Sequence, residues 1–452
     1  MSVDLVVSSE RVVTPDGVRP AAIVVAQGRI QNIVPIGDAP PPHAAASVNA
    51  GSAAVLPGLV DTHVHLNEPG RTEWEGFVTG TRAAAAGGVT TLIDMPLNSI
   101  PATTTVSALR LKLQAAAPVA LVDYGFWGGV VPGNVDDLEP LLDAGALGFK
   151  CFLVPSGVDE FAHVGESDLR PAMQRLAARD AVLLAHAELP GPIARAAPQG
   201  DPRRYATWLA SRPEDAEVEA IKLLLRLSEE TGCRVHIVHL SAATALPIIE
   251  RARRAGARIT VETCPHYLTF AAEAVPDGST AYKCAPPLRS AANREQLWDG
   301  LARGIIDLVA TDHSPAPPAL KRLDSGDFMA AWGGVASLEL SLAAVWSGAR
   351  AHGHALDDVA RWLCGAPARL AGLDRKGRIA PGCDADLVIF DPDAEWSVEP
   401  VRLRQRHPIT PYAGMTLQGK VRQTFLRGVS IYENGRTRER PEGQWVRRAI
   451  VG

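Results

Sequence analysis

Two histidines separated by one residue are the strongest chemical signal in this sequence. His63 and His65 end the apolar segment 54–65, which has the composition of a buried strand. Side chains two positions apart on a strand point the same way, so both imidazoles should face one space. Imidazole is a common metal ligand, and the pair predicts a site for a divalent cation. Taken alone, the pair is also compatible with two ordinary polar residues at a strand end.

Single polar residues interrupt four later apolar segments at matching positions, and these are Lys150, His186, His239 and Asp312. Each alone has a structural interpretation, such as a histidine satisfied in the core or an aspartate that caps a helix. If the segments are strands of one parallel barrel, their carboxyl ends meet at one mouth. Together with the histidine pair, they predict a ligand set for two divalent ions.

Lys150 requires a separate chemical argument because an ammonium group cannot ligate a metal. Phe149 and Phe152 flank it in an apolar segment, and burial disfavours its charged form. A neutral amine reacts with CO2 to form a carbamate, whose two oxygens can bridge ions about 3.5–4 Å apart. We therefore expect Lys150 to be an N6-carboxylysine. An ion pair with an acid at the barrel mouth and a Schiff-base lysine are the alternatives.

Two such ions predict hydrolysis by an activated water. Metal binding lowers the pKa of water from 15.7 to about 7, and one ion can polarise a carbonyl group. Asp312 is the predicted catalytic residue, since it can accept the proton of the attacking hydroxide and pass it to the departing nitrogen. A rival mechanism would use a thiol, and Cys284 in KCAPPLR is the best candidate. We favour a structural or backbone-contact role for that cysteine.

The middle of the chain alternates strand and helix patterns. Strands are predicted at 54–65, 89–96, 120–129, 146–153, 181–188, 234–241, 258–265 and 307–313. Between them lie helical patterns, of which 213–232 is bounded by Pro213 and Gly232. Eight such units in about 310 residues predict an α/β fold, a (β/α)8 TIM-like barrel. An open doubly wound sheet is the alternative, but no GxGxxG motif follows the first strand to support a dinucleotide site.

The two ends of the chain differ from this middle. Both contain short strand-like segments bounded by Gly and Pro, and a Pro- and Ala-rich connector occupies 37–48. We predict a small β-sandwich domain built from both termini, at 1–53 and 375–452. The barrel then occupies 54–374.

The composition of the chain limits the classes of function that it can have. The 452 residues are 46% hydrophobic and 21% charged, as in globular proteins. No apolar run reaches the roughly 18 residues of a membrane helix, and the N-terminus lacks a signal-peptide pattern, so we expect a cytoplasmic protein without a membrane partner. A net charge of −5 argues against a nucleic-acid partner. Six cysteines without a CxxC pair suit reduced thiols. The basic run 436–448 is expected to be a solvated or subunit-contacting tail, with a polyanion site less favoured.

These motifs together resemble the cyclic amidohydrolases, the family of allantoinases, dihydropyrimidinases (hydantoinases) and dihydroorotases. The likeness covers nearly the whole chain, from PGLVDTHVHLNEPGR through GFKCFL, HAE, HIVHLS and ATDHSP to GRIAPGCDADLVIFD. It implies two divalent metal ions per chain, zinc first and Co, Mn, Ni or Fe as alternatives, CO2 or bicarbonate for the lysine, and a homotetramer. By the family pattern one ion lies among His63, His65, carboxylated Lys150 and Asp312, and the other among Lys150, His186 and His239.

The resemblance also implies contacts with the substrate. Asn98, Ser314 and the backbone at Cys284 would bind the amide and carbonyl groups of the ring. His266 and His313 lie in family motifs but are not implied to be ligands. His236 shares the inward parity of His239 and should lie one layer deeper in the barrel.

The implied substrate is a small, uncharged ring. Dihydroorotase-like sequences usually have an arginine two residues after the second histidine, where this chain has Asn67. A neutral side chain there suits allantoin, a hydantoin ring with a ureido arm. Segments such as HLNEPGRTEWEGF and FMAAWGGVASLEL also have the character of the allantoin-hydrolysing branch. Hydrolysis of allantoin to allantoate, in purine and ureide nitrogen catabolism, is the expected function.

Two other functions remain open at this stage. A dihydropyrimidinase or hydantoinase would use the same attack on a related cyclic ureide. A non-catalytic scaffold of the same fold is disfavoured because all six ligand positions are retained. Trp74, Phe161 and Trp332 are candidates for a gating loop, with ordinary packing as the alternative for each.

Overall fold

Parallel strands from the middle of the chain close into a barrel in this computed structural model, which describes residues 3–36 and 44–448. The strands are β6 (Leu59–Val64), β7 (Val89–Asp94), β8 (Asp123–Phe126), β9 (Gly128–Gly129), β10 (Phe149–Phe152), β11 (Val182–His186), β12 (Arg234–Ile237), β13 (Ile259–Thr263) and β14 (Leu308–Val309). Strands β6 to β8 form one sheet and β9 to β14 another. Only Trp127 separates β8 from β9, and a bridge between Val64 and His313 joins the other edges. The predicted barrel is confirmed, and the open doubly wound sheet is wrong.

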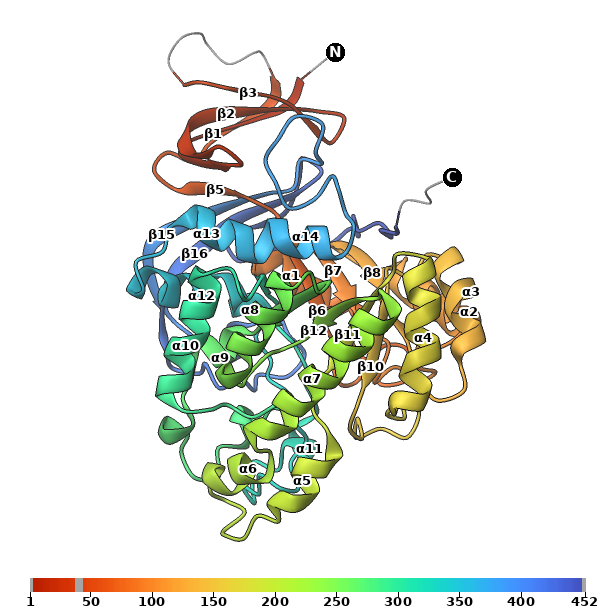
Figure 1. The fold of residues 1–452 in the computed structure, drawn as a ribbon. Helices are drawn as coiled ribbons and strands as arrows, with labels where there is room; N and C mark the ends of the chain where they lie inside the picture. The colour runs from red at the N-terminus through yellow and green to blue at the C-terminus, as the bar shows by residue number, and fades with distance from the viewer. Residues whose placement is uncertain (1–2, 37–43, 449–452) are drawn as a thin grey trace.

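Helices surround the barrel strands (Figure 1). They are α1 (Phe77–Ala86), α2 (Val106–Ala116), α3 (Leu138–Asp143), α4 (Glu166–Ala178), α5 (Pro190–Ala196), α6 (Tyr205–Ser211), α7 (Glu214–Thr231), α8 (Leu246–Arg254), α9 (Pro265–Thr269), α10 (Ala291–Ala302), α11 (Pro318–Lys321), α12 (Ser341–Ala351), α13 (Leu356–Ala360) and α14 (Ala366–Leu370). The helix predicted at 213–232 is α7. Acidic residues in the first turn of α7 stabilise the helix by interacting with the positive end of its dipole. Gly232 ends the helix with a φ of 74°.

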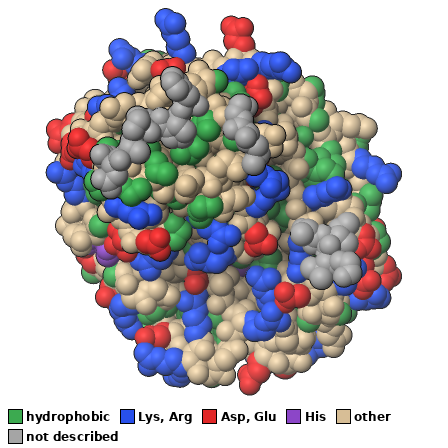
Figure 2. All heavy atoms as spheres, turned by 90° about the horizontal axis from the view of Figure 1, so that it is seen from above, with side chains coloured by type: hydrophobic (Ala, Val, Ile, Leu, Met, Phe, Trp, Pro, Cys, Tyr) green, Lys and Arg blue, Asp and Glu red, His purple; other side chains and the backbone are tan. Residues whose placement is uncertain are grey.

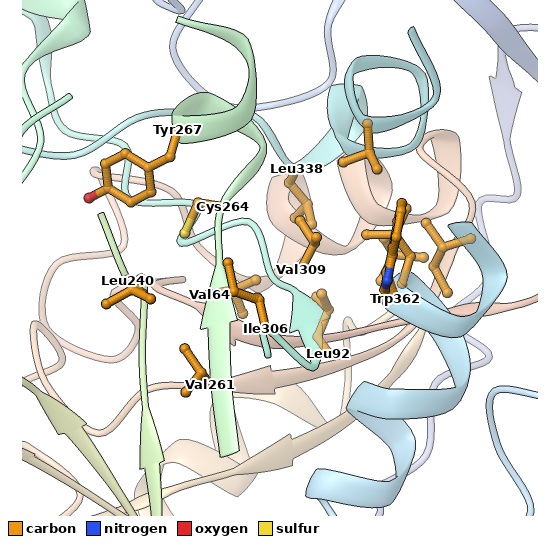
Figure 3. Close-up of a cluster of buried hydrophobic side chains, with 14 of the residues drawn as sticks. Val64, Leu92, Leu240, Val261, Cys264, Tyr267, Ile306, Val309, Leu338 and Trp362 are labelled. Carbon is orange, nitrogen blue, oxygen red and sulfur yellow. The ribbon is translucent and has the colours of Figure 1, made fainter. Parts of the chain in front are cut away.

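The largest core lies between the barrel strands and these helices. Figure 3 shows part of it, with Leu92 from β7 near Trp362 from the segment before α14, and Val64 from β6 near Ile306. Val261 from β13 and Leu240 from the segment after β12 belong to the same buried cluster. Because apolar side chains pack against the outside of the strands, the polar residues of the strands can point inward and toward the mouth.

Strands from both chain ends form the β-sandwich domain, whose N-terminal strands and C-terminal strands lie together in Figure 1. They are β1 (Val3–Thr14), β2 (Gly17–Ala26), β3 (Arg29–Val34), β4 (Ala44–Asn49), β5 (Ala54–Pro57), β15 (Leu387–Ser397), β16 (Thr416–Leu426), β17 (Val429–Glu433) and β18 (Arg436–Thr437). Strand β5 connects the two groups because it pairs with both β1 and β15. A separate apolar core, which includes Ile23, Val55 and Phe425, lies within the sandwich.

Two segments near the ends differ from their sequence interpretation. Residues 37–43 of the predicted connector lie outside the described residues, but 44–49 form β4, which runs parallel to β1. Its sequence, AAASVN, lacks the alternation that marks a strand. In the basic run, Trp445 bridges to Tyr124 of β8, and Val446 N donates to the Tyr124 carbonyl at 2.8 Å. Trp445 and Val446 therefore pair with β8, and this part of the run is not a free solvated tail.

A buried ion cluster, which we call the joint cluster, fastens the start of β8 to the C-terminal segment. Lys376 Nζ lies 2.6 Å from Asp123, 2.7 Å from Asp386 and 3.0 Å from Asp384. Arg427 Nη1 lies 2.5 Å from Asp123. Charges of both signs are therefore paired where the two domains meet.

The surface seen from above carries Lys and Arg interspersed with Asp and Glu (Figure 2). Within residues 3–36 and 44–448, no helix combines the length and the apolar character needed to span a membrane. All six cysteines are free and buried.

Candidate metal centre and active site

The six predicted ligand residues gather at the carboxyl-terminal mouth of the barrel. His63 lies in β6 and His65 follows it, Lys150 lies in β10, His186 ends β11, His239 follows β12, and Asp312 follows β14. All six are buried, with 0–8% of their surface exposed. Separate strands therefore bring them to one place, as the barrel prediction requires.

Three of these side chains already form a compact group of potential ligand atoms. One ligand atom from each of His63, His239 and Asp312 lies within 4.8 Å of the others. The Oδ1 atom of Asp312 is 3.2 Å from His63 Nε2 and 3.3 Å from His65 Nε2. Burial would raise the pKa of Asp312, but the neighbouring histidines outweigh burial and hold that pKa below its usual range. An ionised carboxylate among imidazoles is a donor set that suits zinc and similar divalent ions.

The other predicted ligands adjoin this group. The ring of His239 is 5.4 Å from that of His63 and 4.6 Å from that of His186, measured between centroids. The ring of Phe152 stacks on His186 at 4.5 Å, and the Nζ atom of Lys150 lies 4.8 Å from the centre of the Phe152 ring. Lys150 is thus placed beside the histidines that the second ion would need.

The amine of Lys150 has no hydrogen-bond partner among the described residues. It is fully buried, and burial lowers its pKa to about 8. The alternative of a lysine paired with an acid at the mouth is therefore not seen in the described part of the chain. A buried amine without a partner fits a group that becomes a carbamate, because the neutral form is the one that reacts with CO2.

Glu262, at the end of β13, fixes the orientation of His63. Its Oε1 atom lies 2.5 Å from His63 Nδ1 and accepts the backbone N–H of His239 at 3.2 Å. Burial would raise the pKa of Glu262, but His63 and His236 outweigh burial and hold it at about 2. The ionised carboxylate directs the other nitrogen of His63 toward Asp312, as carboxylates that accept the free N–H of a metal-bound histidine do. Sequence reasoning missed this residue.

Glu188 has the same relation to His186. Its Oε2 atom lies 2.7 Å from His186 Nε2 and also contacts Arg212. Burial would raise the pKa of Glu188, but Arg212 and His186 hold it at about 2. This contact leaves His186 Nδ1 as the nitrogen available to a metal. The acid in HAE was a readable signal, since it follows the histidine by two residues in an apolar strand.

The three histidines that were not expected to be ligands lie outside the compact group. His236 Nε2 is 3.0 Å from Glu262, and its Nδ1 is 2.8 Å from Thr260. His313 Nδ1 accepts backbone N–H groups after β14, and its Nε2 is 3.3 Å from Glu75. His266 is fully buried, and burial lowers its pKa to about 4. Each is held by the protein or packed in its interior.

Backbone strain coincides with the site. Four predicted site residues have left-handed φ values, with Asn67 at 62°, Asn98 at 68°, His239 at 41° and Asp312 at 46°. Such conformations are uncommon for residues other than glycine and persist where the surrounding structure enforces them. The strands end in these turns, which direct His239 and Asp312 into the mouth.

A cavity of about 250 Å³ opens onto these groups. Its wall includes the predicted substrate contacts Asn98 and Ser314. It does not include Asn67, whose side chain donates to the His65 carbonyl at 3.0 Å, or Cys284, whose carbonyl accepts the Trp208 indole N–H at 3.0 Å. Cys284 is also buried, and burial raises the pKa of its thiol to about 12, which opposes a thiolate nucleophile.

The aromatic residues considered for a gate take different roles. Trp332 lines the cavity and meets Trp74 edge to face, with 5.0 Å between ring centroids. Phe161 is fully buried and packs edge to face against Phe152 at 6.1 Å. Phe161 therefore fits the alternative of ordinary packing and not a role in a gating loop. Phe152, which flanks Lys150, also lines the cavity, and three further wall residues were not singled out from the sequence: Trp208, Arg212 and Lys283.

Comparisons with known proteins agree with this architecture. The chain is 52% identical to an allantoinase from Streptomyces avermitilis over 99% of both chains. It is 44% identical to an allantoinase from Arabidopsis thaliana over 95% of this chain and 88% of that one. Among solved structures, an L-hydantoinase (dihydropyrimidinase) from Arthrobacter aurescens matches with a TM-score of 0.93 and 33% identity, over 99% of this chain and 100% of the other.

The family follows from these matches and from the barrel-mouth geometry. The model of the amidohydrolase family matches residues 54–431, which include all six residues of the candidate metal centre. A buried group of histidines and an aspartate at that mouth agrees with metal use. The chain belongs to the amidohydrolase family.

Proposed function

We propose that this chain hydrolyses the hydantoin ring of allantoin to give allantoate, a step of purine and ureide nitrogen catabolism. The proposal draws on the 52% identity with the Streptomyces avermitilis allantoinase over 99% of both chains. Hydantoinases and dihydropyrimidinases are the alternative, and the solved example among them is 33% identical. The observation that carries the chemistry is the convergence of His63, His239 and Asp312 beside the partnerless amine of Lys150.

Two divalent ions, zinc in the first instance, complete the proposed site. One would be held by His63, His65, Lys150 and Asp312, and the other by Lys150, His186 and His239. Lys150 would act as a carbamate: its amine nitrogen bonds to the carbon of CO2, an electron pair of one C=O bond moves to oxygen, and the amine proton leaves to solvent. The product is an anion with two donor oxygens, which supplies the negative charge that a lysine cannot.

When bound, such ions lower the pKa of water and polarise the carbonyl that is attacked. The side chain of Asp312 then accepts the proton of the attacking water and delivers it to the ring nitrogen as the C–N bond breaks. Glu262 and Glu188 hold His63 and His186 in one orientation each. Asn98 and Ser314, on the cavity wall, orient the ring, and Asn67 holds the backbone of His65 through its hydrogen bond to that carbonyl.

The proposal is tested by turnover of a substrate panel. Purified protein, supplied with zinc and bicarbonate, is assayed for kcat/KM with allantoin, hydantoin and dihydrouracil. We expect allantoin to be the best substrate. Asp312→Asn should lose at least about a thousandfold in kcat because the proton acceptor is removed. A preference for dihydrouracil would replace the proposal with a dihydropyrimidinase, and fewer than one ion per chain, unchanged by added metal and bicarbonate, would favour a scaffold.

We also propose a homotetramer located in the cytoplasm. Light scattering on the eluting protein measures the first, and a stable dimer or monomer would contradict it. Fractionation of the source cells measures the second. One relative, from Aquarana catesbeiana, is named as a mitochondrial allantoinase. Recovery of this protein in the organelle fraction would therefore contradict the cytoplasmic location.

A further inference from the structure

Two cationic side chains lie on the cavity wall, and the reaction described above does not use them. Arg212 and Lys283 both line the cavity, in which Asp312 is the one lining carboxylate among the described residues. Both cations contact the same indole: Lys283 Nζ is 4.2 Å and Arg212 Cζ is 5.3 Å from the centre of a Trp208 ring. Trp208 is 7% exposed, so this wall is built into the protein and is not a loose surface.

The hydrogen bonds of these groups leave donors that are not used. The Nζ atom of Lys283 donates to the carbonyls of Met329 at 3.2 Å and Ala331 at 2.5 Å. Within the described residues, the guanidinium of Arg212 has one hydrogen bond, to Glu188. A guanidinium carries five N–H donors in a planar fork. The Trp208 indole N–H is taken by the Cys284 carbonyl, and Lys283 has one N–H left beyond its two hydrogen bonds, so Arg212 is the group of this wall with the most spare donors.

The position of Arg212 relates it to the reacting ring. Arg212 and His186 contact the same oxygen of Glu188, so the guanidinium lies one carboxylate away from a proposed metal ligand. If the amide of the substrate ring lies at the six proposed metal ligands, a substituent on the ring comes within reach of the wall that carries Arg212. Planar acceptors such as a urea carbonyl match the fork of a guanidinium, and the indole face holds that fork in place.

We propose that Arg212, supported by Trp208 and Lys283, is a specificity-determining residue that donates to the carbonyl oxygen of the ureido arm. The inference rests on the proposed function and names the group that separates allantoin from a bare hydantoin. The ureido arm carries no charge. Its oxygen can therefore accept a charge-assisted hydrogen bond from Arg212 while the ion pair between Arg212 and Glu188 stays intact. Lys283 holds the segment that carries Ala331 and Trp332 against the same wall.

The test compares two ligands that differ in the arm alone. For the wild type and Arg212→Gln, kcat/KM is measured with allantoin and with hydantoin, and hydantoin is also measured as a competitive inhibitor in case it binds without turnover. The selectivity for allantoin over hydantoin should fall about 10- to 100-fold in Arg212→Gln, the usual worth of a hydrogen bond to a charged group. Arg212→Lys keeps a charge beside Glu188 but loses the fork, and should give a smaller fall.

Glu188→Gln is the matched control for an effect through His186. It should reduce the values for both ligands alike and leave the selectivity within about threefold, since the amide oxygen can still accept the hydrogen bond from Arg212 and Glu188 does not itself line the cavity. An equal loss for both ligands in Arg212→Gln, at unchanged selectivity, would overturn the inference and reduce Arg212 to a partner of Glu188.

Folding and the proposed function are controlled separately. Zinc content and the thermal midpoint are measured for each variant, and Lys283→Met, which is expected to lower the same selectivity, replaces Arg212→Gln if that protein does not fold. A wild type that hydrolyses allantoin while all the wall variants keep its selectivity would contradict the inference alone. A wild type that does not hydrolyse allantoin would contradict the proposed function as well.

Discussion

Two buried clusters of charged side chains, at different places on the barrel, have opposite states of hydrogen bonding. In the joint cluster, Lys376 is surrounded by three aspartates within 3.0 Å. At the mouth, the amine of Lys150 and the Nδ1 atom of His239 have no partner among the described residues. Burial does not separate the two lysines, since Lys150 is 0% and Lys376 is 6% exposed.

The difference between the two lysines extends to their protonation. Burial lowers the pKa of Lys150 to about 8. Burial would also lower the pKa of Lys376, but its aspartates outweigh burial and raise that pKa above its ordinary value. Buried polar groups are almost always hydrogen-bonded, so a partnerless one marks a place completed by something else. The comparison teaches that unmet hydrogen bonding, together with left-handed backbone, identifies the reactive cluster, whereas burial and charge alone do not.

The largest effect should come from Lys150→Met, which removes the proposed carbamate from between the ions. We expect at least a thousandfold loss of kcat/KM for allantoin, about 4 kcal/mol of transition-state stabilisation. Zinc content should fall below two ions per chain, while the thermal midpoint changes little, since the amine makes no hydrogen bond to the described residues that would be lost. Lys420→Met, on the exposed part of β16, is the matched control. Retention of two ions and of activity in Lys150→Met would contradict the proposed role.

Lys376→Met should have the reverse profile. Removing the cation leaves three buried aspartates without their shared partner, and breaking such a buried pair costs about 3–5 kcal/mol of unfolding free energy. Chemical denaturation measures this loss. Zinc content of the folded fraction should stay at the wild-type value, because the joint cluster does not reach the cavity. A loss below about 1 kcal/mol would place this cluster with ordinary surface pairs.

Glu262→Gln should have an intermediate effect confined to the mouth. The amide keeps the shape of the side chain but loses the charge that orients His63, and removing such a partner of a ligating histidine lowers metal affinity about 10- to 100-fold. Competition with a chelator measures the affinity for zinc. An unchanged affinity would mean that the 2.5 Å contact between Glu262 and His63 does not tune the site.

The smallest effect is the pH dependence contributed by Lys376. Its pKa is raised above 10.5 in the folded protein, so its contribution to stability is fully present below pH 10.5 and is lost as the pH rises above that value. The unfolding free energy of the wild type should therefore decline more steeply above pH 10.5 than that of Lys376→Met, with a difference in slope that approaches about 1.4 kcal/mol for each pH unit. Parallel curves for the two proteins would show that Lys376 is not held by its aspartates.

The sequence predicted the parts of this comparison that local patterns encode. The predicted barrel strands are short apolar runs, and each proposed ligand is a polar residue in such a run or shortly after it, so the topology of a barrel was enough to bring them together. The partners of those ligands were harder to predict, because they depend on contacts across the fold. Glu262 is separated from His63 by 199 positions, and no periodicity links the two.

Other features failed for different physical reasons. The strand β4 was missed because AAASVN has no apolar alternation, and its partner β1 determines its conformation. The wall formed by Trp208, Arg212 and Lys283 was missed because its members look like surface residues in sequence. Trp208 lies in α6, Arg212 follows that helix, and Lys283 lies in the loop before α10, so only the fold brings the three side chains to one cavity wall. The joint cluster was also not predicted, since its members come from both domains.

The most direct test of the account is a crystal structure of the active protein, prepared with zinc and bicarbonate and measured with anomalous scattering. We expect two zinc peaks at the barrel mouth, contacted by His63, His65, His186, His239 and Asp312, and density beyond the amine of Lys150 that bridges them. An active crystal with an unmodified Lys150, or with no ion beside Asp312, would contradict the account.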